Sequence, residues 1–187
     1  MEPLSVEQQM PAMQSLNNYF DLRARVDQWC QKVEADFPTQ VRCEKGCASC
    51  CRHLSLFWVE AVALALALED LPENQAERLR ERAAEATLDS PCPLLEEGAC
   101  MLYAARPLIC RTHGLPLLLE NDGDSTVDFC EKNFTDLDAL PAQAVLDLNL
   151  LNTTLAAINN LFISEVFQGR PPDQPRLSIA EALLLEL

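Results

Sequence analysis

Four cysteines within nine residues constrain this chain more than any other feature of its sequence. They are Cys43, Cys47, Cys50 and Cys51, and the 187-residue chain has nine cysteines in all. In a chain without an export signal, thiols at this density are more often metal ligands than disulfides. An odd number of cysteines also leaves at least one thiol outside any scheme of internal disulfides. We therefore expect the fold to be organised around a metal ion or an iron–sulfur centre.

The length and the charge narrow the class of protein. A chain of 187 residues fits a single domain, which we take as residues 1–187. A domain of this size buries about 70% of its unfolded surface, so it does not need covalent staples to fold. The formal net charge of −15 argues against a nucleic-acid partner, because a basic face supplies most of the affinity for nucleic acid. It argues equally against an anionic membrane surface.

We also expect no targeting segment in this sequence. The first residues have neither a basic start nor an apolar run, so we expect no signal peptide. No run of about 18 apolar residues predicts a membrane span. We therefore expect a cytoplasmic protein in a reducing environment, where free thiols remain available for metals.

Apolar periodicity predicts a mainly α fold with one or two short β-hairpins. Residues 16–37 repeat apolar side chains at helical spacing, and this buried face includes Cys30, which we interpret as a core residue rather than a ligand. Three further helices are expected at 58–71, 73–88 and 141–167, and a capping-box sequence at Ser178 predicts a last short helix. Within this scheme, Glu60 is expected to be a carboxylate in the first turn of its helix.

Hairpin signals occur in the middle of the chain. Turn residues between Cys92 and Cys100 indicate a small hairpin, and Asn121-Asp122-Gly123-Asp124 separates two apolar arms in the manner of a second one. We expect residues 40–135 to form the cysteine-rich core, with flanking helices at 14–37 and 141–187.

Eight thiols remain once Cys30 is set aside, and all eight are candidate metal ligands: Cys43, Cys47, Cys50, Cys51, Cys92, Cys100, Cys110 and Cys130. The first ones recur at helical intervals, so three of them could share one face of a short helix. The neighbours Cys50 and Cys51 would then point about 100° apart and could hardly both close one mononuclear site. The set therefore allows one four-ligand site with spare thiols, two four-ligand sites, or one multinuclear site. Thiolates suit zinc and iron–sulfur clusters equally, so the spacing does not choose the metal.

These motifs resemble a known family, the YkgJ-like cysteine-cluster proteins with a CxxCxxCC-type zinc- or iron-chelating domain. The resemblance covers about residues 40–135 and rests on Gly46-Cys47-Ala48-Ser49-Cys50-Cys51, Cys92-Pro93-Leu94-Leu95, Gly98-Ala99-Cys100-Met101-Leu102-Tyr103, Arg106-Pro107-Leu108-Ile109-Cys110-Arg111, Thr112-His113-Gly114-Leu115-Pro116, Cys130 and Asn133-Phe134. The family opens with Cys-x₂-Cys, whereas three residues separate Cys43 from Cys47 here. The resemblance implies a metal-binding protein. A related domain in flagellin lysine N-methylases also implies an alternative, a cluster-dependent enzyme such as a methyltransferase.

Several polar residues stand near the cysteines in the sequence. Arg106, Arg111 and Tyr103 are candidates for a supporting layer around the centre, where the arginines would offset thiolate charge or only brace loops. The two histidines, His53 and His113, are interpreted as loop residues, although His113 could replace a spare thiol. Three functions remain open: metal binding through zinc or an iron–sulfur cluster, cluster-dependent catalysis, and metal storage or delivery.

Overall fold

The structure is a computed structural model, and it describes residues 16–43, 46–87, 89–121, 124–137 and 139–187. Over these ranges the fold is mainly helical, as predicted, and its strands are short. The α-helices are α2 (Asn17–Asp36), α3 (Trp58–Glu69), α4 (Glu73–Glu85), α5 (Leu108–Thr112), α6 (Leu148–Val166) and α7 (Ile179–Leu183).

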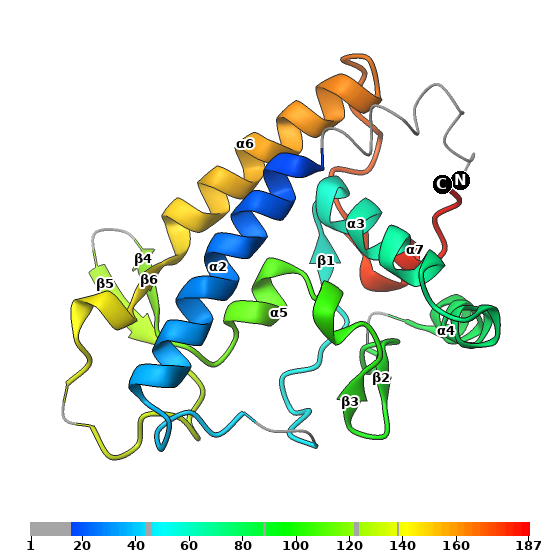
Figure 1. The fold of residues 1–187 in the computed structure, drawn as a ribbon. Helices are drawn as coiled ribbons and strands as arrows, with labels where there is room; N and C mark the ends of the chain where they lie inside the picture. The colour runs from blue at the N-terminus through cyan, green and yellow to red at the C-terminus, as the bar shows by residue number, and fades with distance from the viewer. Residues whose placement is uncertain (1–15, 44–45, 88, 122–123, 138) are drawn as a thin grey trace.

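The two longest helices, α2 and α6, lie side by side and run in opposite directions (Figure 1). Each one buries a single stripe at helical spacing: Tyr19, Val26, Cys30 and Val33 on α2, and Leu151, Leu155, Phe162 and Val166 on α6. Cys30 is 8% exposed, and its thiol donates to the Arg111 carbonyl oxygen at 3.6 Å. The prediction that Cys30 belongs to the core is confirmed.

Helix α3 is buried on almost every side and packs against α6 and α7. This agrees with its nearly continuous apolar sequence, since a helix without a polar face must be covered all round. Helix α4 instead buries only the stripe formed by Ala76, Leu79 and Ala83. Helix α7 begins with the predicted capping box, in which Ser178 Oγ accepts from Glu181 N at 3.1 Å and Glu181 Oε2 accepts from Ser178 N at 2.7 Å.

The start of α6 differs from the sequence prediction. The apolar stripe predicted a helix from Pro141, but residues Ala142–Ala144 form a 3₁₀ turn and Leu146–Asp147 form strand β6. The helix begins only after Asp147, whose side chain accepts a hydrogen bond from Leu150 N at 2.8 Å. An aspartate at this position satisfies a free amide of the first turn and so marks the helix start.

Both predicted hairpins are present among three small sheets. Strands β2 (Leu95–Glu96) and β3 (Ala99–Cys100) form one, and β4 (Leu117–Asn121) and β5 (Asp124–Asp128) form the other. The turn at residues 122–123 lies outside the described residues. Strand β6 pairs in parallel with β4, and β1 (Ser55–Leu56) pairs with β7 (Leu177–Ser178).

The prediction of a helix through the first cysteines is wrong. Residues 46–51 are turns and irregular chain, and the described residues between α2 and β1 contain no helix. Gly46 has φ of +97°, in the left-handed region that interrupts a helix. The thiols of this segment therefore do not share a helical face, and their arrangement depends on what the segment packs against.

Candidate metal centre

The eight candidate cysteines come from segments that gather at one end of the molecule. These segments are the loop between α2 and β1, the β2–β3 hairpin with the chain before it, α5, and the chain after β5, all in the lower half of Figure 1. All nine cysteines of the chain are free thiols. We divide the eight into two neighbouring groups of four: the outer group (Cys43, Cys47, Cys50 and Cys130), arranged about Gly114 and Asn133, and the inner group (Cys51, Cys92, Cys100 and Cys110), arranged about the Arg52–Pro91 bridge and the β2–β3 hairpin.

Gly114 and Asn133 bring the two ends of the outer group together. A Cβ atom on Gly114 would lie 3.3 Å from Cys130 Cβ and 3.5 Å from Cys43 Sγ, so both cysteines pack on the same face of this glycine. The Asn133 side chain is buried, and its Nδ2 donates to the Gly114 oxygen at 2.7 Å and to Cys43 Sγ at 3.7 Å. Its Oδ1 accepts from Arg42 N at 2.8 Å. One amide thus ties together the three segments that carry Cys43, Gly114 and Cys130.

The remaining outer thiols belong to the same short loop. Lys132 Nζ lies 3.6 Å from Cys47 Sγ and brings a positive charge to the group. Burial raises the pKa of Cys43, the Asn133 hydrogen bond lowers it, and the nearby Cys130, Cys50 and Cys47 raise it again. The other three outer thiols thus lie close enough to Cys43 to affect its ionisation. Two of them, Cys43 and Cys50, are exposed to solvent.

The inner group is built on backbone pairing. Arg52 and Pro91 form an isolated antiparallel bridge, and in that register the next residues to face each other are Cys51 and Cys92. Cys100 ends strand β3 opposite Leu95, while Leu95 N donates to the Cys92 oxygen at 3.0 Å. The β2–β3 hairpin therefore holds Cys92 and Cys100 in one compact unit.

Helix α5 supplies the fourth inner thiol. Burial raises the pKa of Cys110 to about 12, with Cys92 and Cys100 raising it further and Arg106 lowering it. Burial also raises the pKa of Cys92 to about 11. Cys92 is the one buried member of the eight, and the other three inner thiols are partly exposed. The inner group therefore lies deeper in the fold than the outer one.

Arg106 is the cation of the inner group. It lowers the pKa of three inner thiols, Cys51, Cys100 and Cys110. Its own hydrogen bonds go to backbone oxygens, from Nε to Tyr103 at 3.1 Å and from Nη1 to Cys110 at 3.3 Å, and its guanidinium carbon lies 3.6 Å from the centre of the Tyr103 ring. These bonds show that Arg106 braces the loop, and its role in offsetting thiolate charge remains a prediction.

Arg111 is positioned differently. Its side chain is buried and donates to Asp27 Oδ1 at 2.5 Å on α2, to the Arg106 oxygen at 2.6 Å and to the Ala104 oxygen. These bonds tie α5 to α2 and to the 3₁₀ turn Tyr103–Ala105. The bonds described for Arg111 therefore form a brace for the chain around Cys110, and a role in offsetting thiolate charge remains a prediction for this residue.

The two histidines also have distinct surroundings. His53 uses both ring nitrogens: Nδ1 lies 2.8 Å from the Thr87 oxygen, which can only accept, and Nε2 accepts from Ala180 N at 3.2 Å. These bonds require the neutral ring with its proton on Nδ1 and leave no nitrogen free for a metal. His113 is exposed at the end of α5.

Glu60 links the metal-site region to the core. It is 4% exposed, and its oxygens accept from Leu108 N at 3.0 Å and from Phe57 N at 3.4 Å. It therefore stabilises the first turn of its own helix, as expected, and also the start of α5, which carries Cys110. Burial raises the pKa of Glu60, although both amide bonds and the charge of Arg176 lower it.

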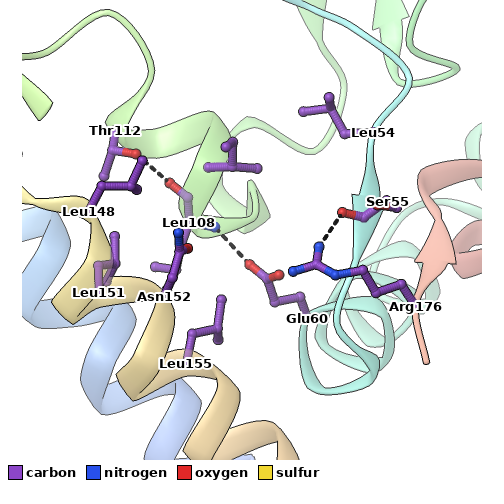
Figure 2. Close-up of a pocket in the computed structure, with 11 residues that line it drawn as sticks. Leu54, Ser55, Glu60, Leu108, Thr112, Leu148, Leu151, Asn152, Leu155 and Arg176 are labelled. Atoms are coloured by element: carbon purple, nitrogen blue, oxygen red, sulfur yellow. Dashed lines mark hydrogen bonds between the residues drawn. The ribbon is translucent and has the colours of Figure 1, made fainter. Parts of the chain in front are cut away.

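A pocket of about 230 Å³ lies between α5, α6 and β1 (Figure 2). Most of its wall is apolar, and Figure 2 shows the guanidinium of Arg176 beside the carboxylate of Glu60. Arg176 Nη1 donates to the Ser55 oxygen at 3.1 Å, so this end of the pocket is polar. Because Leu108, Ile109 and Thr112 of α5 line it, the pocket and Cys110 share one short helix.

The cysteine-bearing segments lie together, but the thiols that the structure describes do not form a closed coordination sphere. Within the described ranges, no three or more His, Cys, Asp or Glu side chains are placed as a formed metal site. The donor set still fits a thiophilic metal, because soft sulfur donors favour zinc and iron–sulfur clusters and each group has a cation beside it. The sequence assigned no role to Lys132 or Asn133: Lys132 stands out only by its position after Cys130, and Asn133 only as part of the Asn133-Phe134 motif of the family resemblance.

Fold and site together define a cysteine-rich, mainly α protein with thiol donors on converging loops. Residues 42–131 match the model of the CxxCxxCC family, described as "Putative zinc- or iron-chelating domain", which confirms the resemblance seen in the motifs. No curated protein and no solved structure matches the chain. In the described part of the chain, no helix has the length and apolar character needed to span a membrane.

Proposed function

We propose that this protein binds zinc or an iron–sulfur cluster through Cys43, Cys47, Cys50, Cys51, Cys92, Cys100, Cys110 and Cys130. The observation that carries the proposal is that the separate segments that bear these eight free cysteines lie together at one end of the fold. Buried or crowded thiols with raised pKa values stay protonated when no metal is present, whereas a bound metal stabilises the thiolate form. When bound, the metal would cross-link the loops, and an iron–sulfur cluster would also supply a redox centre.

The test is anaerobic purification followed by metal analysis and a visible spectrum. A brown protein with a broad absorption band and about four irons per cluster would identify an iron–sulfur centre. A colourless protein with stoichiometric zinc would identify a zinc protein and reject the cluster. Protein that takes up neither metal when reconstituted under reducing conditions would overturn the proposal.

An enzyme is the second candidate, and the pocket beside α5 is the observation that favours it. Its apolar wall and its Glu60–Arg176 end would suit a small organic molecule close to Cys110. Cluster-dependent methyl transfer is one such reaction. Thermal shift assays of the metal-loaded protein with methyl donors would support this candidate if a donor stabilised wild type but not a variant with Leu155→Trp filling the pocket.

Other features of the chain support a metal as the principal partner. A net charge of −15 disfavours nucleic acid and anionic membranes. Nine free thiols favour a reducing compartment such as the cytoplasm. Metal storage or delivery is the third candidate function, and it depends on whether any of the bound metal exchanges readily.

A further inference from the structure

We propose that the chain holds two metal centres of different lability, an inner structural centre at Cys51, Cys92, Cys100 and Cys110 and an outer exchangeable centre at Cys43, Cys47, Cys50 and Cys130. This inference rests on the proposed function and adds the number of centres, their ligands and their behaviour. It is carried by the positions of the thiols, by their tethers and by their exposure.

The adjacent residues Cys50 and Cys51 mark the division between the centres. Cys50 ends the stretch that begins at Cys43, whose thiol lies beside Cys130 at Gly114 and Asn133. Cys51 instead faces Cys92 in the register of the Arg52–Pro91 bridge. Because Cys50 and Cys51 are adjacent in the chain, the two groups meet at this pair. A double cysteine can thus serve two four-ligand sites without the distortion that one mononuclear site would impose.

The outer and inner groups have the same number of thiol donors, and each lies near positive charge. Each group has four thiols, the usual ligand number for structural zinc and for a cubic iron–sulfur cluster. Basic side chains also lie close to both groups, Arg106 and Arg82 at the inner group and Lys132 at the outer one. If only one group bound metal, the other four thiols would stay protonated and would not need a basic side chain beside them.

The tethers of the two groups differ. The inner thiols come from three separate elements: the end of the loop at Cys51, the β2–β3 unit and α5. The buried core residues Leu94, Leu102 and Leu108 lie two residues from Cys92, Cys100 and Cys110 in the sequence. Metal held there cross-links distant segments, and its release requires those elements to separate. Three of the four outer thiols instead come from one eight-residue stretch, 43–50, so release needs only local opening.

Exposure differs in the same direction. The outer group contains the two exposed thiols, Cys43 and Cys50, and the inner group contains the buried one, Cys92. A chelator or an accepting protein can therefore approach outer sulfur atoms directly. We expect the outer metal to leave first, with the fold held in place by the inner metal.

Zinc release from the reconstituted protein tests this inference. Wild type is loaded with zinc under reducing, anaerobic conditions, and release to a chromogenic chelator is followed in time. We expect two zinc ions per chain and two phases of equal amplitude, with rates at least about 10-fold apart. The outer double variant Cys47→Ser/Cys130→Ser should bind one ion and lose the fast phase, while Cys30→Ser should retain both phases.

The inner variant Cys92→Ser/Cys100→Ser alters a buried part of the fold, so its loss of metal would not separate ligation from folding, and a measurement on wild type stands beside it. Metal-loaded protein is treated briefly with iodoacetamide during partial chelation, and labelled cysteines are located by mass spectrometry. Labelling of Cys43, Cys47, Cys50 and Cys130 before the inner thiols supports two centres. Uniform labelling, a single release phase, or loss of all metal from the outer variant would overturn the inference while leaving metal binding intact. Absence of metal from wild type would instead overturn the proposed function itself.

Discussion

Gly98 packs so closely on Gly46 that a Cβ atom at Gly98 would lie 3.1 Å from the Gly46 Cα atom. The two backbones are also joined by a hydrogen bond from Gly46 N to the Gly98 oxygen at 3.1 Å. Gly98 occupies the turn of the β2–β3 hairpin, and Gly46 lies between Cys43 and Cys47. This contact therefore docks the loop of the outer group on the hairpin of the inner group.

Substitution of Gly98 by alanine should weaken this docking. The added methyl group would meet backbone rather than a movable side chain, and φ of +74° is already unfavourable for alanine. We expect a loss of more than about 2 kcal/mol in the free energy of unfolding, measured by urea denaturation, together with faster zinc release. Gly169→Ala is a closely matched control, because Gly169 has φ of +75° with no atom within 4 Å of the added Cβ. Equal effects of the two substitutions would show that the close approach has no energetic weight.

Replacing Asn133 with alanine should loosen the outer group. The change leaves the Gly114 oxygen and Arg42 N without their side-chain partner and opens space beside Cys43. The expected cost is about 2 kcal/mol in the free energy of unfolding, with more rapid loss of the first zinc ion to a chelator. Asn149→Ala removes an exposed asparagine that also bonds to one backbone oxygen, and it should change stability by less than about 0.5 kcal/mol. Unaltered release kinetics in the Asn133 variant would contradict the clamp assigned to this amide.

The charge of Arg106 should strengthen metal binding by the inner group. Because Arg106 lowers the pKa of Cys51, Cys100 and Cys110, its removal makes these thiols harder to ionise. Arg106→Gln should therefore reduce the affinity of the slowly released zinc by about 10-fold in a competition titration. Arg106→Lys restores the charge but not the guanidinium geometry, so partial rescue would assign the effect to charge. Arg78→Gln, an exposed arginine of α4, should have no effect.

Glu60 should make stability depend on pH. Burial raises its folded-state pKa above the ordinary value of 4.5, so the fold favours the protonated carboxyl. That contribution is fully present below the unfolded pKa and is lost as pH rises through the higher folded pKa. In the metal-free, reduced protein, the free energy of unfolding of wild type relative to Glu60→Gln should therefore fall as the pH rises above the ordinary carboxyl pKa of 4.5. A difference that stayed constant, or rose with pH, would show that the two amide bonds outweigh burial.

Local periodicity was sufficient for most helices and for both hairpins. The apolar stripe of α2, the all-round apolar sequence of α3 and the capping box at Ser178 each act through neighbouring residues, so they are readable in one stretch of chain. The start of α6 was missed because the apolar stripe continued through residues that pair with β4, where Asp147 ends the strand and caps the helix. Cys43 to Cys51 were misread as helical because their spacing fits a helix, whereas Gly46 and its contact with Gly98 determine the local backbone.

The sequence by itself determined the chemistry available to this protein: eight thiols apart from one core cysteine, a middle segment that resembles a zinc- or iron-chelating family, and helices around it. Only the tertiary structure decided which thiols are neighbours. The Arg52–Pro91 bridge sets Cys51 beside Cys92. Asn133, three residues after Cys130, bonds to Cys43, which lies 90 residues away in the sequence. The identity of a side chain fixes what it can bind, but the proximity of two side chains far apart in sequence depends on the backbone pairing and packing between them.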